Sequence, residues 1–529
     1  MIWQIRWCDL AIGDLRLMPC VENLPDHGSM MELGYKWVFI LAGVDLVATF
    51  LTVMKIFVGE IVSEKFSVSR RRFDGGGYGE EMQDPKDYVK KEFDSMVIAT
   101  KNGINAPSSP RENMCLSLIE SHVKDKESSE ELNMILTQYV DTLSQRMKYH
   151  IGYPINLYYE HHAALAPLLQ FHLNNFGDPF TQHPTDFHSK DYEVAVLDWF
   201  AQLWEIEKDE YWGYITSGGT EGNLHGLLVG RELLPDGIIY ASTDSHYSIF
   251  KAARMYRVEL ETINSLVNGE IDYEDLRSKL LVNKNKPAII NVNFGTTYKG
   301  AIDDVDMILQ ILENCGYSND RFYIHCDAAL YGLIVPFINH AKIITFKKSI
   351  GSISVSGHKF LGCSMPCGVQ ITRKTYITTI SRKVEYIASI DNTISGSRNG
   401  LAPIFLWYSL SMKGHVGLQQ DAKMCYENAR YLKDRLHKAG ISAMLNEFSN
   451  IVVFERPCDD KFIRRWQLSC TRDMAHVVVM PGTTKEIIDN FFKDLMQERG
   501  KWCGITLAPC LADDIGSQNC LCSYHNIHH

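Results

Sequence analysis

The chain has 529 residues, of which 45% are hydrophobic, and its formal net charge is −11 at pH 7. This length is sufficient for a large domain, a smaller domain and an extension, and the hydrophobic fraction is ordinary for a globular protein. The negative charge argues against nonspecific nucleic-acid binding, and the 14 cysteines are too scattered along so long a chain to indicate a disulfide framework.

Residues 1–127 are predicted to form an atypical N-terminal extension that is partly disordered and contains one apolar segment. This segment, residues 37–58, is long enough to span a membrane, and three arginines follow it at 70–72. Asp45 and Lys55 lie within it, however, and a carboxylate at the centre of a membrane helix costs about 2.5 kcal/mol or more. Membrane contact is therefore not favoured, and a cytoplasmic location is expected.

The rest of the chain divides into four predicted parts. Residues 128–152 form a helical segment whose apolar positions share one face: Leu132, Ile135, Leu136, Tyr139, Val140, Leu143 and Met147. Strand-like and helical runs alternate over residues 153–401, which predicts a large α/β domain with a mostly parallel sheet. Residues 402–510 predict a smaller α+β domain, with a helix from about 418 to 439, strands at 442–445, 451–455 and 476–480, and a last helix at 485–496. Residues 511–529 are predicted to be a tail.

A glycine-rich turn follows the first strand-like run of the large domain. The turn is Thr216–Asn223, and a helix-like run starts at Leu224. Backbone N–H groups and the positive end of a helix dipole suit this position to binding a phosphate. The spacing matches neither a Walker loop nor the dinucleotide fingerprint, and glycine turns before helices are common, so the turn alone is weak support.

Three further strand ends carry polar side chains. His246 is suited to stacking on a flat ring, and Thr296 follows another buried run. Asp327 ends a third run, where a carboxylate is costly unless it meets a cation. A protonated pyridine nitrogen is such a cation, and pairing with it keeps the ring an electron sink. Taken singly, each residue also fits a capping or loop role.

A lysine completes the set. Lys359 lies between a strand that ends at Ser356 and the turn residue Gly362, with His358 directly before it. A lysine held on such a loop can form a Schiff base with a carbonyl cofactor, although an isolated loop lysine is more often a surface residue. Because polar strand ends meet at the edge where open α/β sheets bind ligands, these parts together predict one cofactor site.

The order of the motifs TSGGTEGN, DSHYS, NFGTT, HCDAA and SGHKFLG resembles that of the group II pyridoxal-phosphate-dependent amino-acid decarboxylases. Within that family it is similar to the plant branch called histidine or serine decarboxylases, from about Leu132 to the C-terminus. The resemblance implies an α/β large domain of fold type I, like that of aspartate aminotransferase. It also implies a pyridoxal 5'-phosphate cofactor, carboxy-lyase activity and a homodimer or higher homo-oligomer with the active site at the interface.

The resemblance assigns roles to matching positions. Lys359 would carry the cofactor, Asp327 would pair with its ring nitrogen and His246 would stack on the ring. Thr296 would lie near the face of the cofactor. The phosphate would be held by Gly219, Thr220, Ser356 and His358, and approached from a neighbouring subunit by residues 395–398, which include Ser397.

The residue that protonates the α-carbon after carbon dioxide leaves stays open. Such a step needs a general acid near the reacting carbon. The candidates are His246, Lys359 and Tyr386, and the last of these lies in a polar stretch, residues 381–391, that could be a mobile loop.

The substrate also stays open. Candidate contacts are Tyr158, Glu160 and His162, because a carboxylate or an aromatic wall would suit an imidazole. This stretch is more similar to the plant histidine decarboxylases than to the serine-active members, so histidine is preferred and serine is the alternative. An aldehyde synthase and an inactive paralogue that acts as an oligomerisation partner are the other candidates.

The C-terminus carries residue types found in metal sites. Cys520 and Cys522 are followed by His525, His528 and His529. A second cysteine pair is lacking and the segment is terminal, so a disordered tail without a metal is predicted.

Overall fold

The computed structural model describes residues 126–157, 160–338, 341, 344–502 and 509–523. Nearly all of the predicted N-terminal extension, including its apolar segment at 37–58, lies outside these residues. Among the residues described, no helix has the length and apolarity needed to cross a membrane.

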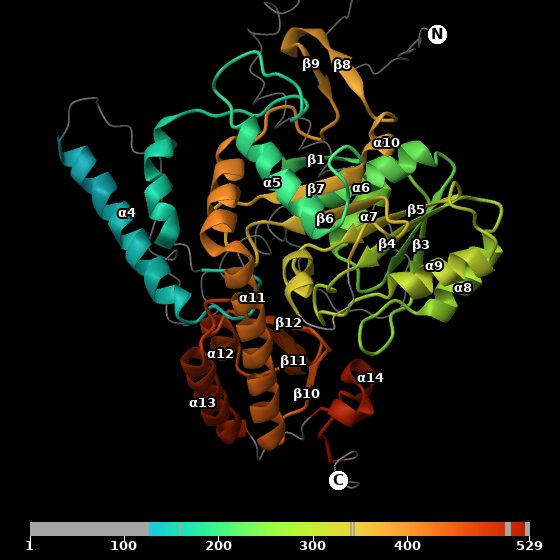
Figure 1. Cartoon of the computed structure of the whole chain (residues 1–529). Helices are drawn as coiled ribbons and strands as arrows, with labels where there is room; N and C mark the ends of the chain where they lie inside the picture. The colour runs from blue at the N-terminus through green and yellow to red at the C-terminus, as the bar shows by residue number, and fades with distance from the viewer. Residues whose placement is uncertain (1–125, 158–159, 339–340, 342–343, 503–508, 524–529) are drawn as a thin grey trace, which may run out of the picture. The chain divides into compact units, whose positions relative to one another are not determined.

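A seven-stranded sheet forms the centre of the large domain (Figure 1). Its strand order is β1-β7-β6-β5-β4-β2-β3, and neighbouring strands are parallel except that β7 runs antiparallel to both β1 and β6. The strands are β1 (Tyr211–Thr216), β2 (Ile238–Ser242), β3 (Leu260–Ile263), β4 (Ala288–Asn293), β5 (Phe322–Asp327), β6 (Ser352–Ser356) and β7 (Gly368–Arg373). The mostly parallel sheet predicted from the sequence is therefore confirmed.

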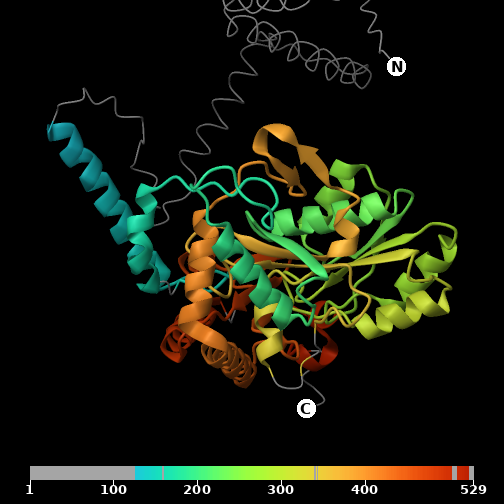
Figure 2. The same cartoon turned by 45° about the horizontal axis from the view of Figure 1, so that its top comes forward.

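Helices cover both faces of this sheet (Figure 2). Side chains alternate along a strand, so Ile238 and Tyr240 of β2 join one core while Ile239 and Ala241 join the other. The first core includes residues of α5 (Lys190–Leu203), α8 (Tyr273–Val282) and α9 (Val305–Asn314). The second core includes residues of α6 (Gly219–Leu233), α7 (Tyr247–Tyr256) and α10 (Lys374–Ile377). A strand buried on both faces leaves only its ends available for chemistry.

Those ends meet at one edge. Strands β2, β4, β5 and β6 run in the same direction, so the residues Ser242, Asn293, Asp327 and Ser356 that end them lie along the same side of the sheet. This is the edge at which open α/β sheets bind ligands.

The stretch predicted as the small domain, residues 402–510, opens with a long helix, α11 (Leu401–Lys438), that is kinked at Gly414, where φ is +58°. The sequence predicted this helix only from about residue 418. The domain contains a four-stranded antiparallel sheet in the order β10-β11-β13-β12. Its elements are β10 (Ala443–Leu445), β11 (Ile451–Glu455), α12 (Asp460–Arg465), β12 (Ser469–Thr471), β13 (Met474–Val478) and α13 (Lys485–Trp502).

The shorter elements include two differences from the predictions. The polar stretch 381–391, predicted as a possible mobile loop, forms a hairpin of β8 (Arg382–Val384) and β9 (Ser389–Asp391). Residues 511–523 of the predicted tail, 511–529, are described and pack against the rest of the chain, with Leu511 and Ile515 buried in the core. The remaining elements are α4 (Lys126–Met147), α14 (Ala512–Ile515) and the 3-10 turns at Glu160–Gln170, Tyr331–Leu333, Val335–Phe337, Glu385–Ile387 and Ser517–Asn519.

Candidate active site

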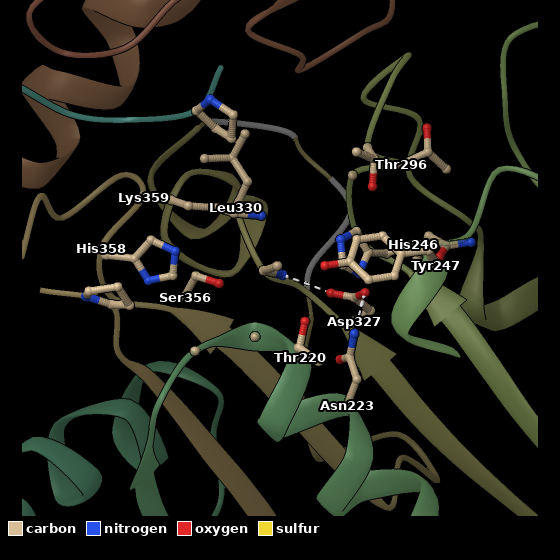
Figure 3. Close-up of a pocket in the computed structure, with 18 of the residues that line it drawn as sticks. Thr220, Asn223, His246, Tyr247, Thr296, Asp327, Leu330, Ser356, His358 and Lys359 are labelled. Carbon is tan, nitrogen blue, oxygen red and sulfur yellow. Dashed lines mark hydrogen bonds between the residues drawn. The ribbon is translucent and has the colours of Figure 1, made fainter. Parts of the chain in front are cut away.

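A cavity of about 360 Å³ lies at the carboxyl edge of the large sheet (Figure 3). Eight of the predicted site residues line it: Gly219, Thr220, His246, Thr296, Asp327, Ser356, His358 and Lys359. They come from five separate stretches of the chain. The sheet topology therefore brings together residues that are more than a hundred positions apart in the sequence. Figure 3 shows Asp327 and Asn223 facing each other at one end of the cavity, with Ser356 and His358 at the other.

Asp327 is a buried carboxylate with two hydrogen-bond donors. Its Oδ1 accepts from the Ala329 backbone N–H at 3.2 Å, and its Oδ2 accepts from Asn223 Nδ2 at 2.7 Å. Both donors are neutral groups, whereas a buried carboxylate is most stable beside a cation. The carboxylate therefore suits a cationic nitrogen placed in the cavity.

Asn223 has every hydrogen-bonding position of its side-chain amide filled. Nδ2 donates to Asp327 and, at 2.9 Å, to Ser248 Oγ. Oδ1 accepts from Ser354 Oγ at 2.7 Å and pairs with His325 Nε2 at 3.0 Å. These four bonds fix the amide, so Asn223 holds the Asp327 carboxylate in one orientation.

A buried chain of hydrogen bonds lies behind Asn223. Because Asn223 Oδ1 can only accept, His325 donates from Nε2, and its neutral ring accepts at Nδ1 from Ser352 Oγ at 2.8 Å. Tyr323 in turn donates its hydroxyl to Ser352 Oγ at 2.6 Å. Burial lowers the pKa of His325 to about 4, which keeps the ring neutral near pH 7. A glycine is required beside this ring, since a Cβ on Gly226 would lie 2.2 Å from His325 Nδ1.

The same amide also orients His246, which caps the start of α7. His246 Nδ1 accepts from the Ser248 backbone N–H at 3.3 Å, so the Ser248 hydroxyl, which itself accepts from Asn223, donates to the same nitrogen at 2.7 Å. With Nδ1 as an acceptor, the neutral ring carries its proton on Nε2. Burial lowers the pKa of His246, while the nearby Asp327 carboxylate raises it.

The other end of the cavity forms an anion cradle at the start of α6. Gly218 precedes the helix with φ at +145°, a conformation that favours glycine, and no side chain caps the first N–H groups of the helix. A Cβ on Gly219 would lie 2.7 Å from Ser356 Oγ, so only a glycine leaves this space open. The uncapped N–H groups, together with Ser356 and His358, suit a phosphate.

Lys359 lies at the cavity wall between these two ends. Burial lowers the pKa of its amine, and the Asp327 carboxylate raises it. A lysine amine with a lowered pKa is more often unprotonated, which is the form that attacks a carbonyl carbon. Carboxylate, amine and anion cradle therefore fit pyridoxal phosphate on residues of this chain alone.

Three predicted site residues lie away from the cavity lining. Tyr386 is 90% exposed on the turn between β8 and β9. Ser397 is exposed and accepts a hydrogen bond from Asn174 Nδ2 at 3.1 Å. His162 is buried, pairs with Ser409 Oγ at 2.7 Å and packs edge-on against Phe405. Of the other substrate candidates, Tyr158 and the side chain of Glu160 lie outside what the structure describes.

Two residues that matter here were missed as individual sites. In the sequence analysis Asn223 appeared only as the last residue of the motif TSGGTEGN, and His325 only as the first residue of the motif HCDAA. The spacing along the chain was an available signal for both. Asn223 lies about one helical turn after the cavity residue Thr220 in α6, so its side chain is on the same face of the helix. His325 lies two residues before Asp327 in β5, so its side chain is on the same face of the strand.

Replacing Asn223 by alanine is expected to reduce turnover about 10- to 100-fold, since partners that orient a reactive group typically contribute this much. The Ser354 hydroxyl and the His325 N–H would also lose a buried acceptor, at about 1–3 kcal/mol each. Ser248→Ala is the matched control, because it removes the hydroxyl that links Asn223 to His246 and keeps the bond from Asn223 to Asp327. Steady-state kinetics and chemical unfolding measure the two effects. Equal loss of turnover in both variants would show that the bond to Asp327 contributes nothing.

Comparisons with known proteins agree with this geometry. The pyridoxal-dependent decarboxylase conserved domain matches residues 116–455. The chain is 75% identical over 414 residues to the histidine decarboxylase of Solanum lycopersicum, covering 78% of this chain and 100% of that protein. It is 57% identical over 411 residues to serine decarboxylase 1 of Oryza sativa subsp. japonica, covering 77% and 85%.

A solved structure shows the same fold. The L-methionine decarboxylase of Streptomyces sp.590 superposes with a TM-score of 0.65 at 25% identity, covering 71% of this chain and 96% of that one. The predicted fold type, cofactor and carboxy-lyase class are thereby confirmed. With the family domain spanning most of the chain and a relative of 75% identity, the chain belongs to the pyridoxal-dependent decarboxylase family.

Proposed function

We propose that the protein decarboxylates histidine to histamine. The observation that carries this choice is the 75% identity to the Solanum lycopersicum histidine decarboxylase along that protein's full length. Serine remains the second candidate, because the identity to the Oryza sativa serine decarboxylase is still 57%.

The cavity residues divide into groups that bind, orient and transfer protons. When bound, pyridoxal phosphate supplies an electron sink for the bond to the departing carboxylate. Asp327 would pair with the ring nitrogen, and Lys359 would anchor the cofactor. His246 and Thr296 would contact the ring. The phosphate would be held by Gly219, Thr220, Ser356 and His358.

Protonation of the α-carbon is assigned to a group at the cavity wall. Lys359 and His246 are the two candidates, since both residues line the cavity and both side chains can transfer a proton. Tyr386 would need a movement of its hairpin, or a second copy of the chain, to reach the same space, because it is 90% exposed.

The substrate side chain has an apolar wall to pack against. Pro154 and Leu330 line the cavity, together with Ile451 and Val478 of the small-domain sheet. A wall of this kind contacts the flat faces of an imidazole more completely than the short polar side chain of serine.

A competition assay tests the substrate. Purified protein with pyridoxal phosphate is offered histidine, serine and aromatic amino acids together, and the products are separated. Histamine and carbon dioxide are expected as the main products. Ethanolamine as the main amine would overturn histidine in favour of serine, and an aldehyde with ammonia and peroxide would indicate an aldehyde synthase. No product from any of them would indicate an inactive paralogue.

We also propose that the protein is a homodimer in which helix α4 covers a second copy. This 22-residue helix is about 33 Å long. Its apolar residues point to solvent, with Leu136 62% and Val140 59% exposed. Its last turn is tied to the small domain, where Gln467 Nε2 donates to the Arg146 carbonyl at 3.0 Å. An apolar stripe of this length is stable in water only when covered.

The double variant Leu136→Glu, Leu143→Glu tests that surface. Two buried charges at an apolar contact are expected to convert the dimer to a monomer, measured by light scattering after size exclusion. Gln138→Glu, on the polar side of the same exposed helix, is the matched control. A mass unchanged in the double variant would exclude α4 from the interface.

A further inference from the structure

Three cysteines gather at the C-terminal segment that the sequence predicted to be disordered. The sulfur atoms of Cys510, Cys520 and Cys522 all lie within 4.8 Å of one another. Cys520 and Cys522 are almost completely buried, and Cys510 is exposed. The sequence predicted no metal here because a second cysteine pair is lacking and the segment is terminal. Folding supplies a third thiol from ten residues upstream of Cys520.

The backbone of this segment is built to hold that arrangement. α14 is a single turn, and Gly516 then reverses the chain with φ at +87°, which favours glycine. Leu511 and Ile515 anchor the turn in the core. The Leu521 N–H donates to Ser442 Oγ at 2.9 Å, next to the edge strand β10. These contacts fix the segment that carries the three cysteines.

A backbone donor points at one of the sulfurs. The Leu511 N–H donates to Cys520 Sγ at 3.3 Å. An N–H donor favours the thiolate form of a sulfur, which is the form that binds a metal. Three thiolates as close as these repel one another unless a cation lies between them.

The spacing is also that of a metal site. A zinc ion bound tetrahedrally by sulfur at about 2.3 Å requires sulfurs about 3.8 Å apart, so the cluster needs to contract by about 1 Å at most. A disulfide requires two of the sulfurs to approach to about 2.05 Å and leaves the third outside the bond.

We propose that Cys510, Cys520 and Cys522 bind one thiophilic metal ion, of the class of Zn²⁺, that fastens the C-terminal segment to the small domain. On binding, each thiol loses its proton to solvent and each sulfur donates an electron pair to the metal. The exposed Cys510 leaves an open side, where a solvent molecule completes the fourth position. This site is separate from the cavity that holds Lys359, and the proposal does not rest on the substrate of the enzyme.

A cadmium titration of the full-length holoenzyme tests the proposal, because Cd²⁺ bound to thiolates absorbs in the near ultraviolet. The protein is produced without an added metal-binding tag, kept reduced, and stripped with a chelator. One equivalent of Cd²⁺ per chain is expected to saturate the absorbance, and Zn²⁺ is expected to compete. Cys510→Ser is expected to weaken binding at least ~10-fold, since even changes beyond the direct ligands cost this much. Cys458→Ser, an exposed cysteine of the same domain, is the matched control.

Several outcomes would overturn the proposal. Cadmium absorbance that stays the same in Cys510→Ser, or that never rises in the unaltered protein, excludes the site. A disulfide between two of the three cysteines in freshly purified protein also excludes it. Cys510 is exposed, so its variant is expected to fold even if a change at buried Cys520 does not. Decarboxylase activity is measured in parallel and is expected to be unchanged, which separates this site from the active site.

Discussion

Replacing Lys359 by alanine is expected to reduce decarboxylation by about 10⁴-fold or more, on the scale of losses seen when a covalent catalytic group is removed. The lysine amine is the group at the cavity wall suited to anchoring the cofactor, and burial lowers its pKa. The visible absorbance of the lysine-linked cofactor is expected to disappear as well. Product formation and absorbance spectra of the purified variant measure the two effects.

Lys251→Ala is the matched control for that experiment. Lys251 lies on α7, over the ring of Tyr247, and its charge lowers the pKa of His246. Its loss is expected to leave both the absorbance and most of the turnover intact. Substantial activity in the Lys359 variant with the cofactor added back would exclude Lys359 as the anchoring lysine.

Replacing Asp327 by asparagine is expected to reduce turnover about 10²- to 10³-fold, comparable to the loss of a preorganised electrostatic partner in other enzymes. Both oxygens of the native carboxylate accept hydrogen bonds, from Ala329 and Asn223. An amide NH₂ group in either position would face a donor, and the negative charge opposite the ring nitrogen would be lost. Turnover measured at saturating cofactor separates the chemical effect from weaker cofactor binding.

Asp327→Glu tests whether charge or position matters more. It keeps the carboxylate but moves it by one methylene, so partial recovery over the asparagine variant is expected. If the asparagine variant has the turnover of the unaltered enzyme, Asp327 has no electronic role and serves only to hold the loop at Ala329.

The sequence located the cavity because its parts sit at strand ends. Glycine turns, a buried run that stops at Asp327 and a loop lysine are all local features, and the parallel sheet places them together. The early start of α11 was missed because Pro403 and Gly414 normally interrupt helices. Pro403 lies in the first turn, where backbone N–H groups have no partner within the helix, so the missing N–H of proline costs no hydrogen bond. Gly414 adopts the non-helical conformation at the kink.

Other features depend on contacts between distant segments. The four bonds of Asn223 join α6 to strands β5 and β6 and to the start of α7. The spacing from Thr220 places Asn223 near the cavity, but it does not reveal these partners. Cys510 likewise joins Cys520 and Cys522 only because the backbone reverses at Gly516.

The chain of hydrogen bonds from Tyr323 to Asp327 has a single direction. Each donor hydrogen, from tyrosine through Ser352, His325 and Asn223, points toward the carboxylate. The successive bond dipoles therefore add, and each polarises the next. Their positive ends stabilise the anion in the way a helix terminus does, but with neutral side chains buried in the sheet. Both hydrogen-bond donors of Asp327 are neutral groups, so a cationic ring nitrogen can join the carboxylate without displacing either of them.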